Sequence, residues 1–223
     1  MQHMTSPLST LSVRDRSRTH LLETAERLFA EHGIDAVSLR QVTAAAGHRN
    51  PAAVQYHFGS KDGLLRAIFE HRVPLLNRRR LELLEQLTDA PAEQHLRIIV
   101  EAIIRPLAEI DPAQRSYVKF LAQLVTIPSR PEQIYASLPG ELGLSGQRTR
   151  EALKRALRHV PEAVAENRRV LLVAFVLTAL AGRLHSSHDE QQGGLSDDAF
   201  LDDVIDAGVG ILSAPHTVRT KEG

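Results

Sequence analysis

The chain has no cysteine and no tryptophan, and aromatic residues make up only 4% of its 223 residues. Without cysteine, a disulfide framework, a thiolate metal site and a thiol nucleophile are all excluded. The lack of thiols is compatible with a reducing compartment, and the first thirteen residues lack the basic start and apolar stretch of a secretory signal. We therefore expect no export and a cytoplasmic location.

A long hydrophobic run is also missing. The longest nearly uncharged apolar segment, residues 170–184, is shorter than the roughly 20 residues that cross a bilayer, and it contains Arg183. It is typical of a buried helix, so we expect no membrane partner.

Common catalytic and cofactor motifs are absent as well. The sequence contains no HExxH metal motif, no nucleophile elbow and no glycine-rich phosphate loop. His185, His188 and Asp189 form the one candidate metal cluster, but they lie in a polar segment where solvated loop residues are the favoured interpretation. We expect a protein that is not an enzyme and that carries no cofactor.

Charge is balanced overall but divided along the chain. Lys and Arg number 27, as do Asp and Glu, yet residues 1–80 carry five more basic than acidic residues and residues 81–223 the reverse. This asymmetry favours a basic N-terminal segment that meets a polyanion, followed by a segment with another task.

The apolar pattern predicts an all-α fold. Apolar residues recur at spacings of three and four, and no segment shows sustained alternation. After a first helix that ends at Gly33, we expect helices at residues 38–47, 51–58, 61–87, 92–109, 112–127, 144–159, 161–184 and 196–212. The Pro- and Gly-rich segment Thr126–Ser145 is typical of a long loop that gates a cavity.

The same pattern suggests a division into regions. We expect a flexible N-terminal arm at 1–13, a helix-turn-helix domain at 14–60, a connecting helix at 61–87, a ligand-binding and dimerisation bundle at 88–214, and a flexible tail at 215–223.

Two short helices with a glycine turn between them stand near the N-terminus. Ser38 and Gln41 have the spacing of a capping box, which starts the first of them. Asn50-Pro51 provides a cap and a first helical residue for the second, whose Val54 and Phe58 share one side while polar groups occupy the other. Preceded by a bracing helix, this is the arrangement that places a helix in a DNA major groove.

At these residues the chain resembles the TetR family of transcriptional regulators. Four segments carry the resemblance: Ala30–Gly33, Val37–Val42, Ala45–Gly47 and Tyr56–Lys61. It implies an N-terminal three-helix DNA-binding domain before a larger helical ligand-binding and dimerisation domain. It also implies that Ser38, Tyr56, His57 and Lys61 contact DNA phosphates and that Phe58 belongs to the core.

Base-reading candidates follow from side-chain chemistry. Gln55 has the groups for a bidentate contact with adenine and Arg49 for one with guanine, while Arg40 is placed to reach the backbone or a base edge. For Arg49, Asn50 and Gln55 a solvated polar face is about as good an interpretation. The linker from Gly47 to the second helix is one residue longer than is usual in the family, which moves the side chains that face the groove.

The segment before the first helix offers a further basic group. Arg14, Arg16 and Arg18 suit an arm that reaches an adjacent minor groove, and a flexible charged terminus is the alternative.

A short reading helix gains specificity from pairing, because two copies related by a two-fold axis read a palindrome. The last two long helices are the best candidates for a homodimer surface, and two core helices of a monomer are the alternative. The predicted interface residues are Val170, Ala174, Leu177, Ala181, Leu201, Val204 and Ile205.

The middle helices supply candidates for a small-molecule pocket. With so few aromatic residues the lining is mainly aliphatic, which favours a lipophilic effector, although such a stripe is more often packed core. The predicted lining residues are Ile99, Ile103, Tyr117, Phe120, Leu121 and Leu124.

Together these features predict a homodimeric, effector-responsive repressor that binds double-stranded DNA at a palindromic operator. A sequence-blind architectural DNA-binding protein is the first alternative, and a helical enzyme is the second.

Overall fold

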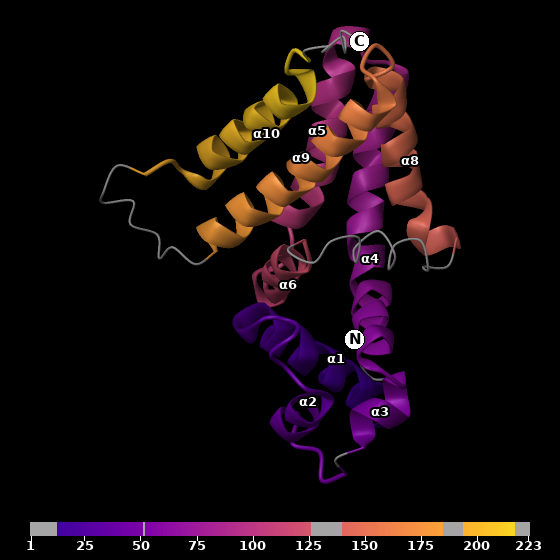
Figure 1. Ribbon diagram of the computed structural model, residues 1–223, viewed down its shortest axis with the longest axis vertical. Coiled ribbons are helices and arrows are strands. Elements are labelled where there is room, and N and C mark those ends of the chain that lie inside the picture. The colour runs from indigo at the N-terminus through magenta and orange to yellow at the C-terminus, as the bar shows by residue number, and fades with distance from the viewer. Residues whose placement is uncertain (1–12, 51, 126–139, 185–193, 217–223) are drawn as a thin grey trace, which may run out of the picture.

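The computed structural model describes residues 13–50, 52–125, 140–184 and 194–216, and all regular elements in these ranges are helices. Three of them form a head at one end of the molecule: α1 (Val13–His32), α2 (Leu39–Ala45) and α3 (Ala53–Phe58). The long helix α4 (Lys61–Glu85) leads from this head into a larger helical body (Figure 1). The predicted all-α fold with a small N-terminal and a larger C-terminal region is confirmed.

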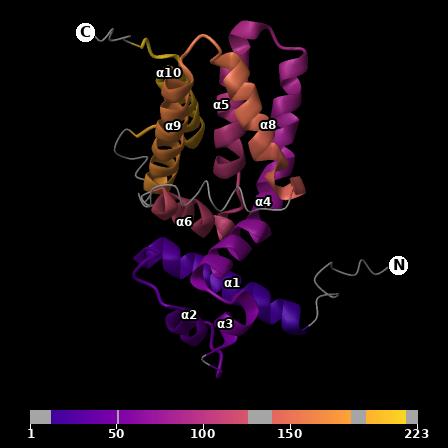
Figure 2. The same cartoon turned by 45° about the vertical axis from the view of Figure 1, so that its right-hand side comes forward.

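The body is a bundle built around α4. Its other elements are η2 (Gln86–Thr88), α5 (Ala92–Ala108), η3 (Pro112–Gln114), α6 (Ser116–Leu124), α8 (Gly140–Ala156), α9 (Glu162–Arg183) and α10 (Asp197–Ser213). Helix α4 packs against α5 and α8, while α10 packs against α9 and α5. Helix α6 lies between α1 of the head and α9 of the body (Figure 2).

A cluster of aromatic rings fills the junction between head and body. Phe29 of α1, Phe69 of α4, and Tyr117 and Phe120 of α6 are all fully buried. The ring centroids of Phe29 and Phe120 lie 6.1 Å apart, and those of Phe69 and Tyr117 lie 6.2 Å apart in an edge-to-face arrangement. Both distances are favourable for aromatic pairs, so these few rings join three helices into one hydrophobic core.

A buried ion pair lies in the same junction. Arg72 of α4 donates two hydrogen bonds to Glu26 of α1, from Nε to Oε2 at 2.7 Å and from Nη2 to Oε1 at 3.2 Å. The hydroxyl of Ser116, the first residue of α6, donates to the same carboxylate. The side chains of Arg72 and Glu26 are only 4% and 2% exposed. Removing charges from water costs free energy, so the Arg72 guanidinium and the Glu26 carboxylate each need the other as an ionic and hydrogen-bonding partner.

One expected loop is partly helical. The segment Thr126–Ser145 is expected to be a loop and a helix is expected from residue 144, but α8 begins at Gly140, so the loop expectation is wrong for residues 140–143. Residues 126–139 lie outside the described ranges. The reason is tertiary: the buried hydroxyl of Ser145 bonds to Asn77 and accepts a hydrogen bond from Arg80, both on α4. Packing of α8 on α4 outweighs the low helix propensity of its glycines.

Several expectations fall on residues that the structure does not describe. These are most of the N-terminal arm, the tail from residue 217 onwards and the candidate cluster His185, His188 and Asp189. Among the helices that are described, none is sufficiently long and apolar to pass through a bilayer.

We expect Arg72→Met to destabilise the protein by about 3–5 kcal/mol, because Glu26 is then left buried without its partner. Replacing both residues, in Glu26→Leu/Arg72→Met, should recover much of that loss, since no charge remains buried. Urea denaturation followed by circular dichroism measures both.

Arg79→Met is the matched control. Arg79 pairs with Glu109 at 2.8 Å, but the two side chains are 41% and 39% exposed. An exposed pair contributes about 0–1 kcal/mol, so a loss as large as that of Arg72→Met would contradict the assigned role of burial.

Candidate nucleic-acid interface

The two short helices of the head are set by local capping. Ser38 is the N-cap of α2: its hydroxyl accepts a hydrogen bond from the Gln41 amide at 3.3 Å, and the Gln41 side chain accepts one from the Ser38 amide at 2.8 Å. The predicted capping box is therefore confirmed. Gly47, with φ of +69°, and Gly59, with φ of +73°, follow α2 and α3 in backbone conformations that other residues adopt poorly.

Helix α3 has one packed side and one open side. Ala53 and Val54 are buried against the head, whereas Gln55 is exposed and Tyr56 is 71% exposed. In Figure 1 α2 and α3 lie at the end of the molecule remote from the body. Tyr56 and Gln55 thus form an exposed surface at one end of the molecule, where a partner can reach them.

The start of α3 differs in detail from the expectation. Pro51 lies outside the described ranges, and the helix begins at Ala53 with Ala52 as its N-cap. The side-chain oxygen of Asn50 accepts a hydrogen bond from the Ala52 amide at 3.0 Å. Asn50 thus supports the entry to α3, and its neighbour Arg49 is exposed in the turn before it.

Lys61 stands where α3 meets α4. Ser60 caps α4 by accepting a hydrogen bond from the Gly63 amide at 3.0 Å. The ammonium of Lys61, in the first turn, lies 5.8 Å from the centroid of the Phe29 ring. This contact holds the charge close to the N-terminus of α4, where free backbone amides favour an anion.

Basic residues of α1 extend this surface. Arg14, Arg16 and Arg18 are all helical, because α1 begins at Val13, so the expectation that they belong to an arm or a flexible terminus is wrong. The Arg14 guanidinium lies 5.7 Å from the centroid of the Tyr56 ring, and that of Arg18 lies 5.2 Å from Phe58. Arg14 and Arg18 are four residues apart, which places them on one face of a helix. The sequence shows this spacing, but it becomes informative only when the helix is known to begin at Val13.

His57 belongs to the same cluster. Its pKa is lowered from the ordinary value by partial burial, and further by the positive charges of Arg14 and Arg18 and by His48. The neutral imidazole is therefore favoured in the free protein. Burial is the largest cause of the lowered pKa, and the neighbouring guanidinium groups of Arg14 and Arg18 add to it.

The other predicted head residues lie on the surface of α2. Ser38 and Arg40, at its N-terminus, are exposed, and α2 packs against α3. The predicted contact residues therefore lie at the start of α2, in the turn before α3, on α3 and at the start of α4.

The predicted dimer residues divide into two groups. Val170 is 46% exposed, and Ala174 and Leu201 are partly exposed. The other four are buried within the protomer: Leu177, Ala181, Val204 and Ile205.

Most of the predicted pocket residues are packed in the core. Tyr117, Phe120, Leu121 and Leu124 are buried, the first two in the aromatic cluster. Ile103 is partly buried against the same core. Ile99 lines a cavity elsewhere, between α5 and α8.

Acidic and imidazole side chains do not gather into a metal site in the described ranges, where no group of three or more could hold an ion.

Comparison with known proteins identifies the head. Residues 21–68 match the family model described as bacterial regulatory proteins, tetR family. We refer to residues 21–68, which match this family model, as the TetR domain. The segment covers most of α1, all of α2 and α3, and the first turns of α4.

A curated relative is similar to this chain over one stretch. The chain is 40% identical over 52 residues to the HTH-type transcriptional repressor AcnR of Corynebacterium glutamicum, and the aligned part is 23% of this chain. That part spans 27% of the length of AcnR, so the similarity is confined to one region.

Solved structures resemble the whole fold. The TetR family transcriptional regulator PfmR from Thermus thermophilus aligns with a TM-score of 0.50 at 23% identity, covering 93% of this chain and 100% of that one. AmtR of Mycobacterium smegmatis also gives 0.50, at 17% identity, covering 96% and 92%. At these identities the likeness shows that the fold beyond the TetR domain is shared.

Within the TetR domain, we expect Gly63→Ala to destabilise the protein by about 1–3 kcal/mol. A Cβ at Gly63 would lie 2.1 Å from the backbone oxygen of Phe58, so α3 and α4 would have to separate. Denaturant unfolding measures the change.

Gly146→Ala is the matched control. Gly146 lies in α8 and has no atom within 4 Å of the position of an added Cβ. The change should stabilise the protein by about 0.5–1 kcal/mol, because alanine restricts the unfolded chain. Equal effects of the two substitutions would show that the close contact at Gly63 does not constrain the junction.

Proposed function

We propose that this protein is a DNA-binding transcriptional regulator that acts as a homodimer, inserting α3 of each subunit into the major groove at a palindromic operator. The observation that carries the proposal is the two-sided character of α3 in a TetR domain: Ala53 and Val54 are buried, and Gln55 and Tyr56 face solvent. A helix that fits a groove needs such a face. As a regulator of transcription rather than an enzyme, it would work in the cytoplasm, where bacterial DNA is.

The contacts divide into anchors and readers. Tyr56, His57, Lys61 and Ser38 are proposed to bind phosphates, supported by the positive charge that Arg14 and Arg18 bring to this surface. Gln55 is the principal proposed base reader, joined by Arg40, Arg49 and Asn50 around the turn. Phosphate contacts set the position of the protein, whereas base contacts set its sequence preference.

Repression is proposed as the outcome, in keeping with the printed description of AcnR as a transcriptional repressor. A small lipophilic effector would bind the body and favour a subunit arrangement in which the two α3 helices no longer match successive grooves. The effector lowers DNA affinity by the ratio of its own affinities for the two arrangements. The corresponding coupling free energy is typically about 1–3 kcal/mol. Helix α4 links the two regions, since it contacts α1, α3, α5 and α8.

The assignment of readers and anchors is tested by two substitutions on an operator selected from a random duplex pool. Gln55→Ala should relax the base preference at one operator position and reduce the free energy of binding to the selected operator by about 1–3 kcal/mol. Lys61→Ala should weaken binding evenly on operator and scrambled duplex and reduce the salt slope by about 1. Fluorescence anisotropy over a salt series measures both.

Arg78→Ala, an exposed position far along α4, controls for loss of charge alone and should leave binding unchanged. If the two head variants behave alike, the division into readers and anchors is wrong. If the wild-type protein selects no palindrome from the pool, the architectural alternative replaces the regulator.

Dimerisation through α9 and α10 is tested at Val170. Val170→Glu places a charge on the half-exposed apolar face of α9, so it should raise the dimer dissociation constant by about tenfold or more, since desolvating an unpaired charge is unfavourable. Sedimentation equilibrium measures the constant.

Leu75→Glu provides the control, because Leu75 is a similarly exposed apolar residue, at 49%, on α4. The proposed interface is wrong if Leu75→Glu dissociates the protein and Val170→Glu does not.

A further inference from the structure

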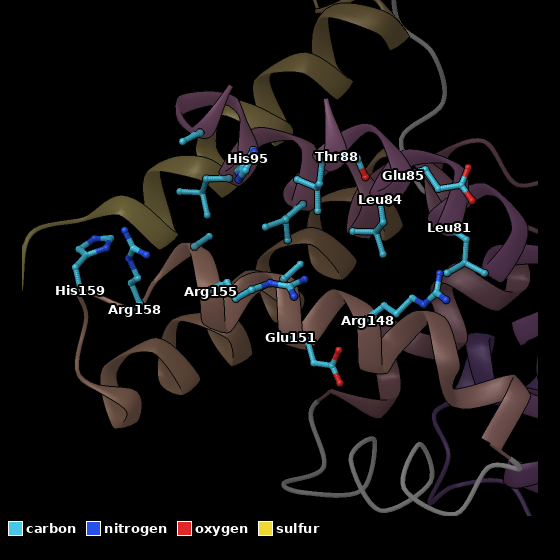
Figure 3. Close-up of a pocket in the computed structure, with 16 residues that line it drawn as sticks. Leu81, Leu84, Glu85, Thr88, His95, Arg148, Glu151, Arg155, Arg158 and His159 are labelled. Atoms are coloured by element: carbon cyan, nitrogen blue, oxygen red, sulfur yellow. The ribbon is translucent and has the colours of Figure 1, made fainter. Parts of the chain in front are cut away.

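A cavity opens in the body at the end remote from the head. It lies among the end of α4, η2, the start of α5, and α8, and its volume is about 820 Å³ (Figure 3). Cavities of about 300–1,000 Å³ accommodate small organic ligands. Of the predicted pocket residues, Ile99 lines this cavity, whereas Tyr117 and Phe120 lie in the aromatic cluster.

One part of the lining is apolar. Leu84 and Leu87 contribute from α4 and η2, Leu96 and Ile99 from α5, and Ala152 from α8. Apolar groups from three directions favour a ligand with a hydrocarbon body, because such a body loses contact with water on binding.

The other part of the lining is basic. Arg148 and Arg155 of α8, and Arg158 just after it, all line the cavity. Arg148 and Arg155 are seven residues apart, so they lie on one face of the helix. In Figure 3 both guanidinium groups lie on the side of α8 that faces α4. Within the described ranges none of these three arginines forms an ion pair with a carboxylate.

The acidic groups of the lining do not neutralise these arginines. The side chain of Glu151 points away from the cavity in Figure 3 and accepts a hydrogen bond from Gln147. Glu85 of α4 also lines the cavity, and among the described residues it forms no ion pair with these arginines. The cavity therefore combines a hydrocarbon wall with guanidinium groups that have donors to spare.

We propose that this cavity binds an amphipathic anion, with an aliphatic body against the leucines and a carboxylate or phosphate head held by Arg148 and Arg155. Guanidinium groups match both head groups through paired hydrogen bonds. An uncharged lipid would leave the arginines facing the ligand without an anion, and a cationic one would be repelled.

The site is also connected to α4. Leu81 and Leu84 of α4 line the cavity, and the nearby Arg80 donates to Ser145 of α8 and to the backbone oxygen of Ala102 in α5. A ligand wedged between α4 and α8 thus bears on the helix that leads to the head. Its role as effector rests on the proposed function, whereas its binding does not.

Isothermal titration calorimetry on the full chain, without DNA, tests the binding. The probes are dodecanoate, dodecyl phosphate, dodecanol and dodecyltrimethylammonium, each below its micelle concentration. We expect at least one anionic probe to bind about tenfold or more tightly than dodecanol and the cation, because only an anion pairs with the arginines. The two anionic arms distinguish a carboxylate from a phosphate head.

The variant Arg148→Gln/Arg155→Gln should bind the anionic probe about tenfold or more weakly than the wild-type protein does. Arg150→Gln is the matched control on the same helix, because Arg150 does not line the cavity, and it should change affinity less than about twofold. Equal binding of all four probes, or an unchanged affinity in the double variant, would overturn the proposal.

Operator binding with the same probe separates the two questions. If the probe binds in calorimetry and weakens operator binding by the wild-type protein but not by Arg148→Gln/Arg155→Gln, the cavity is the effector site. If it binds without changing operator affinity, the cavity assignment stands and the effector part of the proposed function fails.

Discussion

The contact between Glu26 and Arg72 constrains the whole molecule, because it joins the head to the body inside the core. The Glu26 carboxylate, on α1, receives donors from α4 and from Ser116 of α6. Two buried charges tolerate little displacement, since a small separation leaves each without compensation in a medium of low dielectric. The orientation of α1 on α4 and α6 is thus fixed by geometry as well as by apolar packing.

This constraint gives a physical route between the two ends of the molecule. The head surface with Tyr56 depends on α3, whose end is held against α4 by the close approach of Gly63 to Phe58. The cavity with Arg148 and Arg155 depends on the other end of α4. A single long helix, locked near its middle by Arg72, therefore contributes to both surfaces, and a change at one end has a packed path to the other.

The head was predictable because its signals are local. The capping box at Ser38 and the glycines after both short helices act over three or four residues, so they can be read in order along the chain. The TetR motif and the all-helical pattern are equally local. The start of the first helix was not predictable from local signals. Its residues Arg14 and Arg18 contact Tyr56 and Phe58, which are distant in the sequence.

Except at the starts of α1 and α8, the sequence alone determined which segments form helices and which faces of them are apolar, since periodicity and capping are properties of neighbouring residues. Only the tertiary structure decided that Glu26 meets Arg72 across 46 positions, that Tyr117 and Phe120 are core, and that Arg148 faces a cavity. An apolar stripe looks the same whether it meets another helix or an open space. What fills the gap between helices is set by packing of distant segments, which no local pattern specifies.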